Sequence, residues 1–199
     1  MNKQIFIING SGGVGKDEFV NMVSNSKSNY NSHLLGEGED KKLVYIPVLK
    51  VGNYSSVTKV KEIAKIIGWS GEKTEKDRKF LSDLKLLTTE YNDMPLNDMK
   101  KYANSFMVAD NDMSKVLFLH IREPEEIAKA VNEFEEYNVK TILVKRNSVK
   151  HIISNMADEN VYNYDYDIVI NNNGTLEDLK EIADCFVNDF LNNNLKNEY

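Results

Sequence analysis

Five short runs of apolar residues recur along the chain with few polar interruptions. Such runs are typical of strands buried on both faces, as in a parallel sheet with helices on either side. The predicted strands are Gln4–Asn9, Leu43–Leu49, Val116–Ile121, Lys140–Lys145 and Asp167–Ile170. Segments with helical periodicity separate them, which is the alternation that winding strand–helix–strand units requires. We therefore predict a three-layer α/β/α fold with a five-stranded parallel sheet.

The stretch between the second and third predicted strands is longer than one crossover helix needs. It contains three helical patterns, at Val57–Ile67, Phe80–Tyr91 and Met94–Met107. We therefore expect a single domain whose core, residues 1–50 and 115–199, carries a helical insertion at about 51–114. The polar residues 25–40 predict a loop after the first helix.

A glycine-rich segment, GSGGVGKD at 10–17, directly follows the first predicted strand. Its glycines allow successive backbone N–H groups to turn toward phosphate oxygens, and a lysine ammonium can reach the terminal phosphates of a nucleoside triphosphate. A helix that begins near Gly15 would direct its positive dipole end at the same anion. The segment therefore predicts a P-loop (Walker A) site. Its residues are Gly10, Ser11, Gly12, Gly13, Val14, Gly15, Lys16 and Asp17.

The composition of the chain argues against some classes of binding partner. The formal net charge is −6 and no block of Lys or Arg occurs, which argues against a general nucleic-acid binder. No apolar run approaches the roughly 18 residues of a membrane helix. Cys185 is the one cysteine, so no internal disulfide can form and we expect a cytoplasmic protein. Only three cations are arginines, and these sites favour a planar, bidentate contact with phosphate or base.

Cationic and amide side chains follow the predicted strands at the ends where open α/β sheets bind ligands. They are Lys50 after the second strand, His120 and Arg122 at the third, Arg146 after the fourth, and Asn172, Asn173 and Gly174 after the fifth. Cations gathered at one edge of an acidic chain suit a polyphosphate ligand. Structural alternatives stay open: His120 is either a ligand or a core histidine, and Arg122 could pair with Glu125 or Glu126.

The second inserted helix is predicted to have a polar face of Arg78, Ser82, Lys85 and Thr89, opposite Phe80, Leu84, Leu87 and Tyr91. This face either grips a phosphate or is an ordinary solvated surface. The metal site is less complete. Asp17 replaces the usual Ser or Thr whose hydroxyl binds Mg²⁺, so it would hold the ion directly or through a water. Glu123 and Asp158 are alternative ligands, because no carboxylate ends the third strand.

Taken together, these residues resemble the P-loop nucleoside monophosphate kinases, and among them the deoxynucleoside monophosphate kinase-like branch. The resemblance rests on four segments and touches both ends and much of the middle of the chain. They are Gly15-Lys16-Asp17, the segment EKDRKFLSDL at 75–84, IREPEE at 121–126, and DEN at 158–160 with YDIVINNNGTLE at 166–177.

The resemblance implies ATP-dependent phosphoryl transfer to a small phosphorylated acceptor, a (deoxy)nucleoside monophosphate, with Mg²⁺ bound to ATP. Lys16 and the loop would bind ATP, with Arg146, Asn172, Asn173 and Gly174 near the adenine and a short lid at 147–160. Arg78, Lys85, Lys50 and Arg122 would serve the acceptor, and Lys16, Arg122 and Arg146 the catalysis. The chain departs from adenylate kinases in the few arginines of its lid.

Two other functions remain open from the sequence. The acceptor could be a nucleoside, dephospho-CoA or a phosphomevalonate-like metabolite, or the protein could bind nucleotide without transferring phosphate. A guanine-specific switch is not expected, because no Asn-Lys-x-Asp motif occurs. The chain could be either a monomer or a homodimer.

Overall fold

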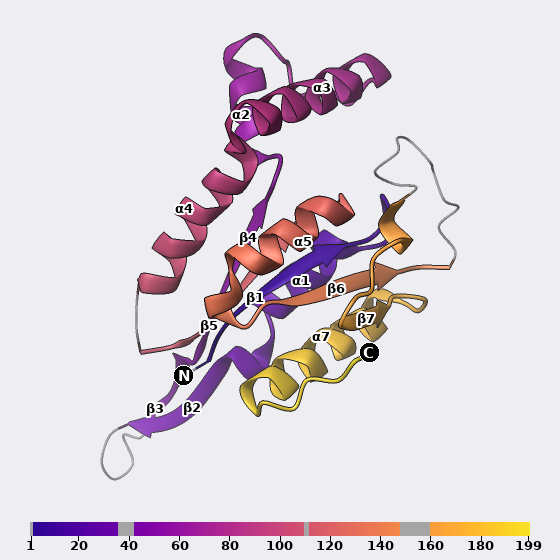
Figure 1. Cartoon of the computed structure of the whole chain (residues 1–199). Helices are drawn as coiled ribbons and strands as arrows, with labels where there is room; N and C mark the ends of the chain where they lie inside the picture. Colours follow the sequence, from indigo (N-terminus) through magenta and orange to yellow (C-terminus); the bar gives the residue numbers. More distant parts are fainter. Residues whose placement is uncertain (1, 36–41, 110–111, 148–159) are drawn as a thin grey trace.

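Five parallel strands form the central sheet of the protein, in the order β4-β5-β1-β6-β7 (Figure 1). The computed structural model describes residues 2–35, 42–109, 112–147 and 160–199. The strands are β1 (Lys3–Asn9), β4 (Leu49–Ser55), β5 (Ser114–His120), β6 (Lys140–Lys145) and β7 (Ile168–Asn171). Helices cover both faces, so the predicted three-layer α/β/α fold with a five-stranded parallel sheet is confirmed.

Side-chain alternation along β1 separates two hydrophobic cores. Phe6 and Ile8 pack with α1 (Lys16–Ser24) and α7 (Leu176–Leu191) on one face of the sheet. Ile5 and Ile7 pack with α4 (Met94–Val108) and α5 (Pro124–Glu133) on the other. All four β1 side chains are buried, and each contributes about 1.5–3 kcal/mol relative to an exposed position. The central strand is thus held from both sides, which makes its end a firm base for the glycine loop.

The predicted second strand, Leu43–Leu49, is wrong. Most of it is β3 (Lys42–Pro47), which pairs antiparallel with β2 (Tyr30–Leu35) in a two-stranded hairpin beside the sheet. A short 3-10 turn, η1 (Lys27–Asn29), precedes β2, so the loop predicted at 25–40 is in part a strand. Pro47 ends β3, since proline has no N–H for a ladder. The sheet strand is β4, which follows Pro47 and whose polar residues hide it from an apolar pattern.

The helical insertion therefore begins at α2 (Thr58–Ile66), because residues 51–55 belong to β4. It continues through α3 (Glu75–Asn92) and α4, which confirms the three helical patterns. A capping box between Thr74 and Asp77 starts α3. In Figure 1, α2 and α3 extend away from the sheet, whereas α4 returns along it. We call α2 and α3 the arm.

The end of the chain adds to the other edge of the sheet. Short turns η3 (Glu135–Tyr137) and η4 (Asn160–Tyr162) precede β6 and β7. A Thr175–Asp178 capping box starts α7, as the sequence predicts. After α7 the chain returns beside β7, where the amide of Asn171 donates to the carbonyl of Tyr199 at 2.8 Å. The tail thereby covers part of the edge that β7 would otherwise expose.

Candidate functional site

The glycine loop joins β1 to α1 at the point where the chain order of the sheet reverses on either side of β1. Lys16, the first residue of α1, folds its side chain back over the loop. Its Nζ donates to the carbonyl oxygens of Gly10 at 2.5 Å and Ser11 at 2.9 Å. The ammonium therefore lies against the loop backbone at the carboxyl edge of the sheet, where α/β proteins bind anionic ligands.

Gly10, Gly13 and Gly15 of the loop have a positive φ that strains any other residue, and at Gly10 and Gly15 a side chain would also collide with a neighbour. Gly10 has φ +148°, and a Cβ there would lie 2.5 Å from the carbonyl oxygen of Val144 in β6. Gly15, at the start of α1, has φ +95°, and its Cβ would lie 2.4 Å from Nδ2 of Asn172. These positions need glycine because their backbone is left-handed and close to a neighbouring segment.

Asn172 links the end of β7 to this loop. Its side chain is buried, and its Nδ2 donates to the carbonyl oxygen of Val14 at 2.9 Å. Its backbone amide donates to the carbonyl of Lys145, the last residue of β6, at 2.8 Å. Its contact here is with the loop backbone, and its predicted binding to ATP stays a prediction.

A second support of the loop, at Asn9, was missed by the sequence analysis. Asn9 is fully buried, and its Oδ1 accepts from the amide of Gly10 at 2.8 Å. Its Nδ2 donates to the carbonyl of Arg122 at 2.9 Å and to the Tyr166 hydroxyl at 2.7 Å. That hydroxyl donates in turn to the carbonyl of Val161 at 2.8 Å. The sequence did contain a signal for this role, because Asn9 is a polar residue at the end of an apolar strand and directly precedes the first glycine.

His120 and Asp17 face each other across the site. The His120 Nδ1 lies 3.8 Å from Asp17 Oδ1, and the His120 side chain is only 14% exposed. Burial lowers the pKa of His120 to about 4, against the opposing effect of Asp17, while Lys16 and Arg122 lower it further. The imidazole is therefore neutral at pH 7. Its Nε2 is buried without a hydrogen-bond partner among the described residues.

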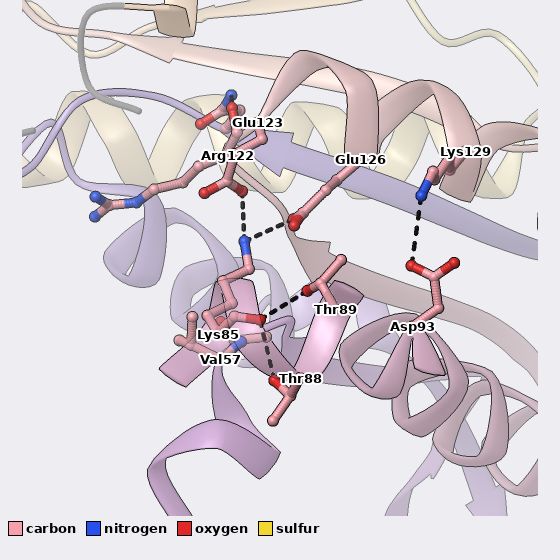
Figure 2. Close-up of polar contacts among 11 residues, drawn as sticks. Val57, Lys85, Thr88, Thr89, Asp93, Arg122, Glu123, Glu126 and Lys129 are labelled. Atoms are coloured by element: carbon pink, nitrogen blue, oxygen red, sulfur yellow. Dashed lines mark hydrogen bonds and ion pairs between the residues drawn. The ribbon is translucent and has the colours of Figure 1, made fainter. Parts of the chain in front are cut away.

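Lys85, a predicted acceptor-binding residue, instead binds two carboxylates. Figure 2 shows its ammonium between Glu123 and Glu126 of the α5 start, at 2.5 and 2.6 Å from their Oε2 atoms. Glu126, one of the two acids left open as a structural partner of Arg122, thus pairs with Lys85. Burial raises the pKa of Glu126 to about 7. Glu123 is also buried, but the nearby charge of Lys85 holds the pKa of Glu123 below its usual value.

The predicted faces of α3 are also wrong. On the face opposite Lys85, Phe80 and Leu84 are only half-buried, and Leu87 and Tyr91 are exposed at 63% and 84%. Lys85 is the one residue of α3 that is buried. Further along α5, Lys129 pairs with Asp93 at 3.4 Å, and Glu133 pairs with Lys100 of α4. Helix α3 thus meets the core through charge pairs, which the heptad-like pattern of its apolar residues does not indicate.

The remaining predicted residues are dispersed. Lys50 pairs in register with Lys115 at the start of β5, whereas Ser55 pairs with His120 at its end. Because the strand boundary was misplaced, Lys50 lies at the opposite edge of the sheet from the glycine loop. Arg78 is exposed in the first turn of α3, where its Nε donates to the carbonyl of Lys73 at 3.2 Å. It stays on the arm as a candidate for the acceptor.

The segment after β6 is described only at its margins. Arg146 directly follows β6 and is half-buried. The amide of Asn147 donates to Oδ1 of Asn173 at 2.8 Å, so the start of the predicted lid lies beside the turn Asn173–Gly174. Residues 148–159 of that lid, among them the alternative metal ligand Asp158, lie outside the described residues.

Lys61 of α2 is a further cation near the site. Its side chain reaches solvent, yet burial of part of it lowers its pKa, with Lys73 and Arg122 acting in the same direction and Asp17 opposing them. The charges of Asp17 and Arg122 therefore act on this lysine of the arm. Sequence analysis overlooked it, because the misplaced second strand left α2 without a defined position.

No known family model matches the sequence, and no curated protein matches it. Within the described residues, no helix is both long and apolar enough to cross a membrane, and no group of three or more His, Cys, Asp or Glu side chains is placed to hold a metal ion.

Proposed function

We propose that the protein binds ATP at the glycine loop and transfers its terminal phosphoryl group to a small acceptor, a (deoxy)nucleoside monophosphate. The observation that carries the proposal is the position of Lys16. Its ammonium lies on the loop carbonyls of Gly10 and Ser11, between the central strand and the start of α1. Strand–loop–helix geometry with a lysine on the loop favours phosphate binding over other ligands.

Catalysis would depend on position and charge. An oxygen of the acceptor phosphate attacks the γ-phosphorus, the bond from γ-phosphorus to the bridging oxygen breaks, and ADP leaves. Loop amides and Lys16 would offset the charge on the ATP phosphates, and Arg122, which follows β5 after Ile121, would act on the transferred group or the acceptor. Arg146 would act from the end of β6, and Arg78 and Lys61 would draw the acceptor from the arm.

The Mg²⁺ that accompanies ATP fits this site through Asp17. The Asp17 side chain is 93% exposed in the first turn of α1, next to Lys16. A carboxylate oxygen there suits Mg²⁺ or one of the waters that this ion usually keeps. Bound Mg²⁺ would supply further neutralisation of the phosphate charge. Glu123 is a poorer ligand, because Lys85 already holds it.

Turnover of ATP with a panel of acceptors tests the proposal. Purified protein is incubated with ATP, Mg²⁺ and each (deoxy)nucleoside monophosphate, and ADP is measured. We expect transfer to at least one monophosphate, and a Lys16→Met variant should lose roughly 100-fold or more of kcat. Lys79→Met removes an exposed lysine of α3 and should change nothing.

The panel also separates the alternative functions. Nucleosides, dephospho-CoA and phosphomevalonate form its second half, and transfer to one of these alone would move the protein to another small-molecule kinase. ATP binding, measured by calorimetry, without transfer to any acceptor would support a nucleotide-binding regulatory protein. Equal ATP affinity in wild type and Lys16→Met would contradict the glycine loop as the binding site.

A further inference from the structure

The contact between the arm and the core is built around a buried lysine. Lys85 lies in the middle of α3, and its side chain is 9% exposed. Apolar residues of the same helix, among them Leu86 and Leu87, remain exposed. A helix that buries a charge and exposes leucines is not held mainly by apolar contact with the core. Its position therefore depends on the partners of that charge.

Those partners lie directly beside the candidate site. Glu123 and Glu126 belong to the start of α5, and Glu123 immediately follows Arg122. The backbone carbonyl of Arg122 is held by Asn9, which also holds the amide of Gly10. A continuous set of contacts thus runs from Lys85 through this turn to the glycine loop. In Figure 2 the Arg122 side chain leaves the same turn and points away from Lys85.

We propose that Lys85 is a positioning residue, which through Glu123 and Glu126 fixes the arm against the turn that carries Arg122. The inference rests on the proposed phosphoryl transfer, in which the arm holds the acceptor and the glycine loop holds ATP. Two carboxylates already surround the ammonium at hydrogen-bond distance, so its charge is used within the protein. Lys85 would therefore act on the distance between the two substrates and would not itself bind the acceptor phosphate.

Kinetics of Lys85→Met and Lys85→Arg test this role. A misplaced substrate slows the chemical step, so we expect Lys85→Met to lower kcat roughly 10- to 100-fold at saturating acceptor. The Kd for ATP should stay within about twofold, because the loop is intact. Lys85→Arg keeps the charge and should restore most of kcat. Lys79→Met, on the same helix with an exposed partner, is the matched control.

Two kinetic outcomes would overturn the proposal. A higher KM for the acceptor with unchanged kcat would show that Lys85 contacts the acceptor. A lower melting temperature with unchanged kcat, measured well below melting, would show a purely structural role. If Lys85→Met does not fold, Glu126→Gln serves instead, since it leaves the Glu123 ion pair in place and should give a smaller loss of kcat in the same direction.

A distance measurement keeps the inference separate from the proposed activity. Spin labels are attached to cysteines at exposed Lys76 of α3 and Ala128 of α5 in a Cys185→Ser background. The wild-type arm should give one narrow distance distribution, and Lys85→Met a broader one. A narrow distribution in both would refute the positioning role even in an active enzyme. A broadened one in a protein without kinase activity would keep the role and refute only the proposed reaction.

Discussion

At the residue scale, neighbouring side chains determine which residues fit in the glycine loop. Gly15 turns the chain into α1 with a left-handed backbone, while the amide of Asn172 occupies the space that any side chain would need. Asn172 in turn holds the Val14 carbonyl, so the loop is tied to the end of β7. Conformation and contact therefore select glycine at position 15 together, independently of any ligand.

Replacement of Gly15 by alanine tests this constraint. We expect Gly15→Ala to lower the free energy of unfolding by about 1–3 kcal/mol, since a left-handed backbone strains any other residue and the Cβ meets Asn172. Gly12→Ala is the matched control, because nothing lies within 4 Å of its added Cβ; it should change stability by less than about 0.5 kcal/mol. Urea denaturation measures both, and equal losses would contradict the argument.

The sequence located this loop correctly because its chemistry is local. The glycines and the lysine that identify it all lie within the eight consecutive residues 10–17. In the structure these residues connect β1 to α1 and include the first residues of α1. Its supports are not local: Asn9 contacts Tyr166, and Asn172 contacts Val14, each across more than 150 positions. A buried amide signals a need for hydrogen bonds, but one sequence does not tell which segment supplies them.

At the element scale, burial explains both the successes and the errors of the sequence reading. Strands β1, β5 and β6 are covered on both faces, so their apolar runs identify them. β4 lies at the edge of the sheet and contains partly exposed polar residues. The preceding β3 has the more apolar sequence although most of its residues are exposed, so it was taken for the sheet strand. Lys50 was assigned to the site for that reason alone. In helix α3, likewise, burial does not follow hydrophobicity, because Lys85 is buried while Leu86 and Leu87 are exposed.

The junction of α3 and α5 should make stability depend on pH. Glu126 has a folded pKa of about 7 against the usual 4.5, so between these values the folded protein keeps a proton that the unfolded chain releases. Its contribution to stability is therefore present at pH 4.5 and declines toward pH 7. The lowered pKa of Glu123 acts in the opposite sense, but below about pH 4.5.

Comparison of wild type with Glu126→Gln isolates this contribution. From pH 5 to 7 the free energy of unfolding of wild type should fall, relative to the variant, by about 1–3 kcal/mol. Effects of His120 cancel in the difference, because both proteins contain it. Denaturant titrations at half-unit pH steps give the two curves. Parallel curves over this range would show that Glu126 titrates normally in the folded protein.

At the scale of the whole molecule, stability is unevenly distributed. The central strands pack into two hydrophobic cores, whereas the arm contributes few buried side chains and the β2–β3 hairpin exposes Leu43 and Tyr45. A two-stranded hairpin is marginal on its own in water. The alternation of strands and helices in the sequence was enough to predict the overall architecture. How firmly the arm and the hairpin pack against the sheet depends on contacts between distant segments, which the sequence does not show.

Hydrogen exchange should display this distribution. Amides of β1, β5 and β6 should exchange most slowly, and those of α2 and α3 at least about tenfold faster, because local opening exposes little apolar surface there. Addition of a non-hydrolysable ATP analogue should slow exchange in residues 10–17 without slowing the β2–β3 hairpin, which serves as the internal control. Equal protection of arm and sheet would contradict this view of the molecule.

The ion pairs along α5 have a practical consequence for work in solution. The Lys129–Asp93 and Lys100–Glu133 pairs are open to solvent, so added salt screens them, while the buried Lys85 pairs are screened much less. Ionic strength is therefore a structural variable for this protein, because it changes how many ion pairs hold α4 and the end of α3 against α5. Rates and affinities measured at different ionic strengths would describe molecules in which these helices are held by different numbers of ion pairs. They can be compared only at one fixed ionic strength.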